Sequence, residues 1–159
     1  MNAVATILHD AYKPGQFPGL IYRLKRPKTA LLLFTSGKAI CTGSKSVGDV
    51  RASIKTVINM LKNGGISVNE NPKIMIQNMV AVYDLGSEMN LNLVAISLGL
   101  ERIEYEPEQF PGLVYRPSDL KVVALLFGSG KVVLTGAKRN EDIDIAIEKL
   151  RYELKASGK

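Results

Sequence analysis

The feature that most constrains this chain is an internal repeat. The stretch YKPGQFPGLIYR at Tyr12–Arg23 returns as YEPEQFPGLVYR at Tyr105–Arg116. A shift of 93 residues continues the match from Tyr12–Lys45 onto Tyr105–Lys138, with 19 identities in 34 positions and no insertion or deletion. Agreement of this kind indicates two copies of one structural unit. We therefore expect a pseudo-twofold axis and a function with two similar halves.

Length and charge narrow the functional classes. Repeats of residues 1–69 and 70–159 are each small for an independent core, so we predict that they form one domain. Lys and Arg outnumber Asp and Glu by 21 to 15. This excess favours a polyanionic partner such as nucleic acid, although a basic protein without a special partner has the same balance. The single cysteine, Cys41, excludes an internal disulfide and fits a reducing compartment.

The apolar runs of the chain are short. A membrane span needs roughly 18 consecutive apolar residues, and runs such as Val122–Phe127 are much shorter. The first residues do not form a charged and then apolar leader. We expect a cytosolic or nuclear protein.

Hydrophobic patterning predicts the same secondary structure in both copies. In the first copy, β-branched and aliphatic runs separated by turn residues predict the strands Leu20–Lys25, Lys28–Phe34 and Lys38–Gly43. A helix with one apolar stripe is expected at Asp49–Lys62, and its counterpart at Glu141–Lys155. One stripe on each helix places both helices on the same face of a sheet. The opposite face of the sheet is then open to a ligand.

One element is expected in the second copy only. Lys73–Asp84 alternates strongly, which predicts a strand with one face formed by Ile74, Ile76, Asn78, Val80 and Val82. The repeat register places Met1 opposite Val94, and the first eleven residues are typical of a short helix, so the first copy has no such strand. Either the chain is truncated or the protein lacks this element. An unpaired strand edge near the centre of the sheet would favour association.

The four phenylalanines form two pairs, each with its members 17 residues apart. Phe17 and Phe34 flank the turn of one hairpin, and Phe110 and Phe127 flank the matching turn, so we expect each pair to meet as cross-strand neighbours. Clustered phenylalanines ordinarily pack in a core. Basic residues, however, recur at matching positions near both pairs: Arg23, Lys28, Lys38, Arg116, Lys121 and Lys131. Aromatic pairs surrounded by cations suit a bent polyanion.

These segments resemble a known family. FPGLIYR and FPGLVYR, LLLFTSGK and LLFGSGK, CTGSK and LTGAK, and IQNMV are similar to the TATA-box binding protein family in its archaeal form. The resemblance covers essentially the whole chain and holds in both repeats. It implies an α+β fold, a pseudo-twofold saddle with a curved antiparallel sheet and helices on the convex face. The first strand of the first repeat would be missing from that fold.

The resemblance also implies a function and its residues. The family's general transcription factors bind the TATA-box in the minor groove, bend it by Phe insertion and nucleate the preinitiation complex. Phe17 with Phe34 and Phe110 with Phe127 would insert, and the six basic residues would hold phosphates. The resemblance places six residues in the minor groove: Asn78, Val80, Val133, Thr135, Ile40 and Thr42. Such small side chains would favour A·T pairs by excluding the amino group of G·C.

The two repeats differ in charge just before the Phe pairs. The first has Lys13-Pro14-Gly15 and the second has Glu106-Pro107-Glu108. Carboxylates beside DNA would repel phosphate, so we expect Glu106 and Glu108 to face a basic protein. The resemblance implies that this protein is transcription factor B, with RNA polymerase recruited indirectly. It also implies a cytoplasmic, nucleoid-associated protein, nuclear if eukaryotic, which could form a homodimer when free of DNA.

The sequence does not indicate an enzyme. TSGK and GSGK lack the full phosphate-loop pattern and are typical of hairpin turns. His9 has no neighbouring Cys or Asp-His partner, and no carboxylate pair suggests acid–base catalysis. We therefore expect no catalytic site, no metal site and no cofactor. Two alternatives stay open, namely a DNA-repair enzyme on a similar saddle, which would need an added domain, and a protein-binding paralogue with weak or no DNA binding.

Overall fold

The computed structural model describes residues 1–156 and divides the chain into two compact units. Unit 1 is Met1–Lys73 and unit 2 is Ile74–Lys159. Each unit contains helices on one face of an antiparallel sheet and has its own apolar core. The predicted α+β class is confirmed. No helix within residues 1–156 is both long and apolar enough to cross a membrane.

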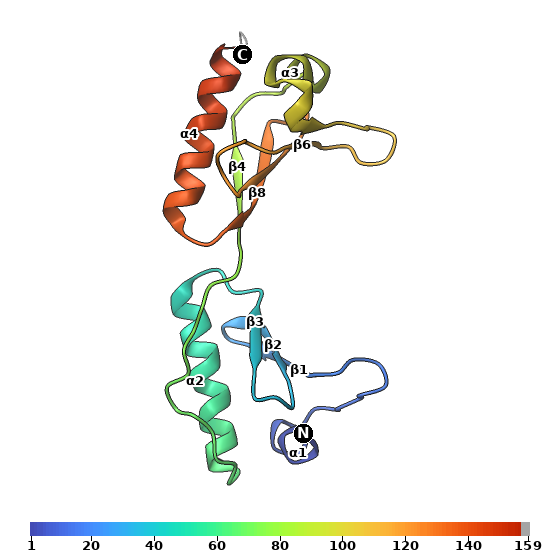
Figure 1. The fold of residues 1–159 in the computed structure, drawn as a ribbon. Helices are drawn as coiled ribbons and strands as arrows, with labels where there is room; N and C mark the ends of the chain where they lie inside the picture. Colours follow the sequence, from blue (N-terminus) through green and yellow to red (C-terminus); the bar gives the residue numbers. More distant parts are fainter. Residues whose placement is uncertain (157–159) are drawn as a thin grey trace. The chain divides into compact units, whose positions relative to one another are not determined.

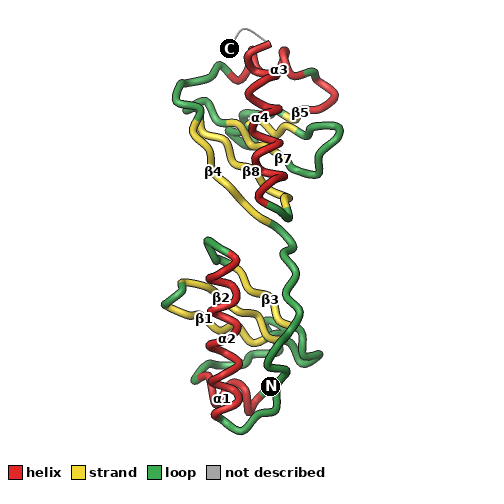
Figure 2. The backbone as a smooth tube through the Cα atoms, turned by 90° about the vertical axis from the view of Figure 1, so that its left-hand side faces the viewer, coloured by secondary structure: helices red, strands yellow, loops and turns green. Residues whose placement is uncertain are grey.

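Unit 1 has a three-stranded sheet in the order β1-β2-β3. Its elements are α1 (Asn2–Leu8), β1 (Leu20–Lys25), β2 (Lys28–Leu33), β3 (Ala39–Thr42) and α2 (Val47–Asn63). The α2 helix crosses one face of the sheet (Figures 1 and 2). Its buried Val57 and Leu61 pack with Leu20 and Leu31 of the sheet. The Ser46 side chain caps α2 by accepting a hydrogen bond from the Asp49 amide, which satisfies a free donor of the first turn.

Unit 2 has a five-stranded sheet in the order β4-β8-β7-β6-β5. Its strands are β4 (Met79–Asp84), β5 (Ile103–Glu104), β6 (Leu113–Tyr115), β7 (Val123–Leu126) and β8 (Lys131–Ala137). Its helices are α3 (Leu91–Leu98), the 3-10 turn η1 (Leu100–Arg102) and α4 (Asn140–Ala156). Figure 2 shows α4 lying across the strands as α2 does in unit 1. Leu113, Leu126, Val132, Leu134 and Leu150 are almost completely buried in the core.

The predicted shift of 93 holds for three strands and the long helix of each unit, but not for the helix that precedes them. The α1 and α3 helices end at Leu8 and Leu98, and Ala5 and Ala95 are buried in the same turn before those ends, so these helices correspond at a shift of 90. The predicted pairing of Met1 with Val94 is therefore wrong. Unit 2 has three more residues between this helix and the first phenylalanine of its pair, and η1 and β5 form there.

The strand predicted at Lys73–Asp84 forms only in its second half. The β4 strand starts at Met79, which pairs with Ala137, the last residue of β8. Residues 74–78 belong to no strand because β8 ends there and offers them no backbone partner. The five residues expected on one face of this strand also differ in exposure. Ile74 and Ile76 are half-buried, whereas Asn78, Val80 and Val82 are exposed.

The first repeat has no counterpart of β4 within residues 1–156. In unit 2 the β4 strand pairs along β8, whereas the equivalent β3 pairs only with β2. The predicted lack of this strand in the first repeat is confirmed for the described residues.

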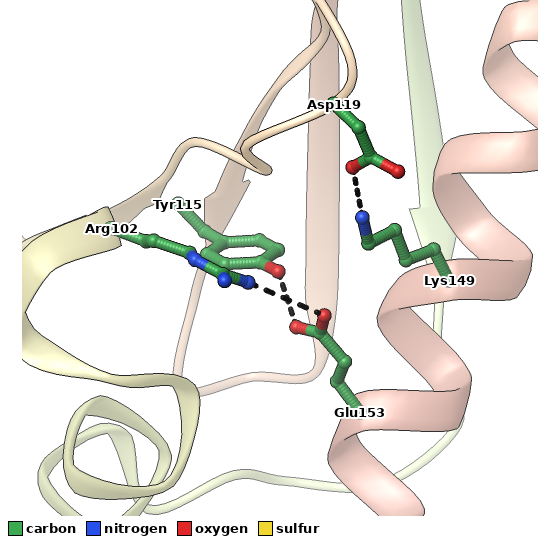
Figure 3. Close-up of polar contacts among 5 residues, drawn as sticks. All are labelled: Arg102, Tyr115, Asp119, Lys149 and Glu153. Atoms are coloured by element: carbon green, nitrogen blue, oxygen red, sulfur yellow. Dashed lines mark hydrogen bonds and ion pairs between the residues drawn. The ribbon is translucent and has the colours of Figure 1, made fainter.

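Polar contacts connect α4 to the sheet of unit 2 (Figure 3). The buried Tyr115 hydroxyl donates a hydrogen bond to the Glu153 carboxylate, and Arg102 Nη1 lies 4.0 Å from Glu153 Oε1. Lys149 pairs with Asp119 in the turn after β6, and this hydrogen bond lowers the pKa of the Asp119 carboxyl. Burial, followed by the hydrogen bond to Glu153, raises the pKa of Tyr115 to about 12.

The raised pKa of Tyr115 predicts a loss of stability in alkali. An unfolded tyrosine ionises near pH 10, so the folded state keeps the full benefit below pH 10 and loses it as the pH rises to about 12. Two pKa units correspond to about 2–3 kcal/mol. Between pH 10 and 12 the unchanged chain should lose about 2–3 kcal/mol more unfolding free energy than the Tyr115→Phe variant, which has no phenol to ionise. Denaturant titrations from pH 9 to 12 would measure this difference, and equal slopes would contradict the assignment.

Candidate nucleic-acid interface

The face of the unit 2 sheet away from its core is apolar and open. Along β8, Val132 and Leu134 are buried while Val133 and Thr135 are only partly covered. Along β4, Val80 and Val82 are 63% and 69% exposed. Alternation with a period of two therefore separates a packed face from an accessible one. Such exposure of β-branched apolar side chains marks an interaction surface.

The unit 1 sheet has the same open face on fewer strands. Ile40 on β3 is 52% exposed and pairs with Leu32, while Thr42 is exposed and pairs with Ala30. In unit 2 the equivalent pairs join Val133 with Leu125 and Thr135 with Val123. The predicted minor-groove residues of each unit therefore lie on its open face.

Asn78 is held in place by two hydrogen bonds. Its side-chain oxygen accepts from the Gly136 amide at 2.7 Å, and its side-chain nitrogen donates to Thr135 Oγ1 at 3.3 Å. Gly136 has φ = +95°, a conformation that disfavours side chains, so the amide that meets Asn78 depends on glycine. The two bonds orient the Asn78 amide beside Thr135 on the open face.

Val82 belongs to this face but was not among the predicted contact residues. It pairs with Val133 across β4 and β8 and is more exposed than Val80. The alternation of Lys73–Asp84 was the available signal, since it placed Val82 on the same side as Val80.

Each Phe pair forms the expected close contact at one end of a hairpin. The ring centroids of Phe17 and Phe34 are 6.1 Å apart, and those of Phe110 and Phe127 are 5.9 Å apart. Phe110 is exposed, whereas the other three rings are half-buried. None of the four rings belongs to the buried core clusters. We call Phe110 and Phe127 the unit 2 wedge, and Phe17 and Phe34 the unit 1 wedge.

Equal spacing around the hairpin turn predicted that the two phenylalanines of each pair lie directly opposite each other. The structure shows a different register. The β1–β2 register pairs Leu20 with Leu33, so continuing it places Gly19, rather than Phe17, opposite Phe34. The unit 2 register pairs Leu113 with Leu126, which has the same consequence. The two rings of each pair therefore meet beside the glycine that lies opposite the second ring.

Two glycines that the sequence analysis missed make this contact possible. A Cβ atom at Gly112 would lie 2.7 Å from Phe110 Cε2 and 3.0 Å from Phe127 Cε1. A Cβ atom at Gly19 would lie 3.0 Å from Phe17 Cε1 and from Phe34 Cε1. The recurrence of the FPGL motif was the available signal. The missing side chain is thus the space in which the rings of each wedge sit.

All six basic residues predicted to contact phosphate are exposed, namely Arg23, Lys28, Lys38, Arg116, Lys121 and Lys131. They come from the hairpins that carry the wedges. Lys38 immediately precedes β3, and Lys131 is the first residue of β8. The Lys38 carbonyl accepts a hydrogen bond from the Phe34 amide, and the Lys131 carbonyl accepts one from the Phe127 amide. Arg116 Nε lies 3.6 Å from Glu104 Oε1 in an exposed ion pair, which water screens strongly.

The loops before the two wedges share a turn but differ in charge. In unit 2, the Gln109 and Phe110 amides donate to the Glu106 carbonyl, and in unit 1 the Gln16 and Phe17 amides donate to the Lys13 carbonyl. Glu106 and Glu108 are both exposed. The same backbone therefore presents two carboxylates in one unit and one ammonium group in the other. Within residues 1–156, no cluster of His, Cys, Asp and Glu could hold a metal ion.

Comparison with known proteins identifies the family. The sequence profile of "Transcription factor TFIID (or TATA-binding protein, TBP)" matches residues 2–64 and 73–157. The TATA-box-binding protein of Thermoplasma acidophilum is 59% identical over 147 residues, which are 92% of this chain and 80% of that protein. The TATA-box-binding protein of Archaeoglobus fulgidus is 55% identical over 159 residues, covering 99% of this chain and 87% of that protein.

A solved structure agrees with these sequence matches. The chain of Methanococcus jannaschii TBP superposes with a TM-score of 0.87 and 56% identity, covering 98% of this chain and 88% of that one. The match therefore includes both repeats. This chain belongs to the TATA-binding protein family.

Proposed function

We propose that this chain is a general transcription factor that binds the TATA-box promoter element through the minor groove. The observation that carries the proposal is the same in each unit: an open apolar strand face ends in a pair of phenylalanines outside the core. TATA-box-binding proteins that are 52–59% identical to the chain support it.

The open faces would read the groove by excluding one chemical group. The minor groove presents only acceptors at A·T pairs and adds the guanine amino group at G·C pairs. At a G·C pair, the guanine amino group would be buried against Val80 and Val133 without a hydrogen-bond partner. Binding would then carry the cost of an unsatisfied buried donor. Asn78, oriented by Gly136 and Thr135, would donate to an A·T acceptor.

The wedges would insert between base steps at the two ends of the site. Pyrimidine–purine steps such as TA unstack most easily, so the cost of deformation would add to specificity. The exposed cations of the strands and turns in each unit would hold the phosphates of the bent duplex. Binding should weaken as salt rises, because each neutralised phosphate releases counterions.

Binding to three duplexes that differ only in their base pairs tests this proposal. The three duplexes are a TATA-box, the same site with G·C pairs, and the same site with inosine·cytosine pairs, which lack the minor-groove amino group. We expect the G·C duplex to bind at least ~100-fold more weakly, since each unfavourable pair typically costs ~1–3 kcal/mol. The inosine duplex should recover most of the affinity, as measured by fluorescence anisotropy.

The same experiment separates the competing explanations. Equal affinity for all three duplexes would contradict minor-groove selection, and no binding to any would favour a protein-binding paralogue. An inosine duplex that binds as weakly as the G·C duplex would point to major-groove reading.

The acidic wedge loop of unit 2 would select a protein partner. We infer that Glu106 and Glu108 dock transcription factor B, through which RNA polymerase is recruited, because exposed carboxylates next to a DNA site attract a basic protein. Only one end of a nearly symmetric site would then accept this factor. The protein would act in the cytoplasm at the nucleoid and would not be an enzyme.

Charge reversal tests this docking site. We expect Glu106→Lys/Glu108→Lys to weaken recruitment of archaeal transcription factor B to the preformed DNA complex at least ~10-fold, while DNA binding is kept or improved. Asp144→Lys/Glu148→Lys reverses two exposed charges on α4 and is the matched control. A gel supershift with purified factor measures both, and equal recruitment by all three proteins would refute the docking role.

A further inference from the structure

The helix side of unit 2 carries an exposed apolar surface that the DNA face does not use. Four large side chains there are between 57 and 77% exposed: Leu93, Ile96, Leu100 and Tyr152. We call them the helix patch. Ile96 of α3 and Tyr152 of α4 line one cavity of about 330 Å³, together with Ser97 and Gly99. Leu93 lies one turn before Ile96 on the same side of α3, and Leu100 follows Gly99.

Unit 1 shows that the fold does not require this patch. At the shifts that relate the helices, Leu93, Ile96 and Tyr152 correspond to Ala3, Thr6 and Asn59, all of them exposed. Leu100 lies in the segment that is three residues longer in unit 2. The same architecture therefore forms with small or polar residues at these positions. Packing alone does not explain why unit 2 exposes large apolar groups.

The cavity is also particular to the residues of unit 2. Ser97 corresponds to Ile7, whose side chain packs against the end of α2: a Cβ atom at Gly64 would lie 2.5 Å from Ile7 Cδ1. Glu153, which also lines the cavity, corresponds to Met60. Tyr22 donates to the sulfur of Met60 at 3.6 Å, whereas Tyr115 donates to Glu153. Unit 1 thus has the apolar side chains of Ile7 and Met60 at the positions where Ser97 and Glu153 line the unit 2 cavity.

The charge around the patch is acidic on a basic protein. Residues 91–108 and the end of α4 at residues 148–156 together carry six carboxylates against four cations, a net charge of −2. The corresponding residues 1–15 and 55–63 carry one carboxylate against three lysines, a net charge of +2. Arg102 lies beside Glu153 (Figure 3), and Glu101 is exposed at the cavity. Because the whole chain has a net charge of +6, this region would draw a cationic partner that other surfaces repel.

We infer that the helix patch is a docking site for a basic amphipathic helix of a partner protein. One large apolar side chain of that helix enters the cavity between α3 and α4, and neighbouring apolar groups cover Leu93 and Leu100. Its lysines or arginines face Glu101, the exposed carboxylate that lines the cavity. This mode of recognition combines a hydrophobic groove with a charged rim. It is independent of the proposed DNA contacts, because the patch lies on α3, η1 and α4.

A titration with a model helix tests the site. The probe is a synthetic peptide of leucines and lysines arranged as an amphipathic helix, added to the full chain labelled with nitrogen-15. We expect amide shifts confined to residues 91–102 and 149–156, and no binding by the same peptide with glutamates in place of the lysines. Shifts confined to the open sheet faces, or equal binding of both peptides, would overturn the inference.

Residues borrowed from unit 1 provide variants that the fold already accepts. Ser97→Ile fills the cavity as Ile7 does, and Leu93→Ala/Ile96→Thr/Tyr152→Asn replaces the patch with its unit 1 counterparts. We expect each to weaken peptide binding at least ~10-fold with no loss in the denaturation midpoint, as for side chains that anchor an interface. Val47→Asn is the control, because it replaces an exposed apolar residue of unit 1 with the residue at the matching position of unit 2, Asn140. This variant should bind the peptide like the unchanged chain.

Three further outcomes would assign the patch to another occupant. Unchanged peptide binding by both patch variants would exclude the site. Self-association that is present in the unchanged chain and lost in the triple variant, measured by sedimentation equilibrium, would assign the patch to a second copy. Binding of anionic vesicles that depends on the patch would assign it to a lipid surface. Because TATA duplex affinity is measured separately on each variant, failure of the DNA proposal would leave this result interpretable.

Discussion

Replacement of Phe110 and Phe127 with alanine is expected to reduce DNA bending by about half and TATA-box affinity by ~30- to 1,000-fold. The variant loses one of two similar wedges, so a kink should remain only at the other end. Stacking of an aromatic ring on a base contributes ~1–3 kcal/mol. Two rings add to about 2–6 kcal/mol, and the unstacking cost that their loss relieves reduces the net effect to about 2–4 kcal/mol. Unstacking of a few kcal/mol per step is usual for proteins that insert side chains in the minor groove, of which TATA-binding protein is a standard example.

Energy transfer between dyes at the two duplex ends measures the bend, and anisotropy measures the affinity. Tyr152→Ala removes an exposed aromatic residue outside the wedges and should change neither. Gly112→Ala keeps both phenylalanines but places a methyl group where Phe110 Cε2 lies only 2.7 Å away, so it should reduce the bend by displacing the ring. A bend that is unchanged in Phe110→Ala/Phe127→Ala would exclude the wedge role.

Gly130→Ala is expected to destabilise unit 2 by about 2–5 kcal/mol. Gly130 has φ = +94°, and a Cβ atom there would lie 2.2 Å from the Ser87 carbonyl oxygen. A left-handed backbone costs alanine ~1–2 kcal/mol, and a clash with a fixed backbone adds ~1–3 kcal/mol as in an overpacked core. The Gly130 carbonyl also accepts from the Leu85 amide, so the turn cannot move away without breaking that hydrogen bond.

Gly37 is the matched control within the same chain. It occupies the equivalent turn of unit 1 with φ = +88°, but an added Cβ atom would meet nothing within 4 Å. Gly37→Ala should therefore show only the backbone cost of about 1–2 kcal/mol. Hydrogen exchange of the β8 and β2 amides would measure the stability of each unit separately. Equal losses at the two glycines would show that the contact with Ser87 is not what makes Gly130 necessary.

The secondary structure of each repeat could be predicted closely from local patterns. Both long helices are within two residues of the predicted ends, because their apolar stripes and the Ser46 cap act locally. The strands of the first hairpin were placed within one residue. The two Phe pairs also follow from the sequence, since equal spacing around a hairpin turn brings the rings of each pair together.

The finer geometry of the candidate site could not be predicted in this way. The predicted direct opposition of each Phe pair was two residues from the true register, which hid the role of Gly19 and Gly112. The start of β4 was missed because it is set by the end of β8, a segment more than fifty residues later. The bonds of Asn78 to Thr135 and Gly136 were missed for the same reason.

The sequence by itself determined the repeat, the elements of each copy, the open sheet face, the wedge residues and the difference in charge between the two loops. All of these depend on spacing along the chain, because side chains alternate every two residues in a strand and recur every 3.6 in a helix. The tertiary structure alone decided the shift of 90 between α1 and α3, the start of β4, the glycines beneath the wedges and the cavity beside Tyr152. Each of these depends on which backbone groups and side chains from distant segments meet, and no local periodicity records that choice.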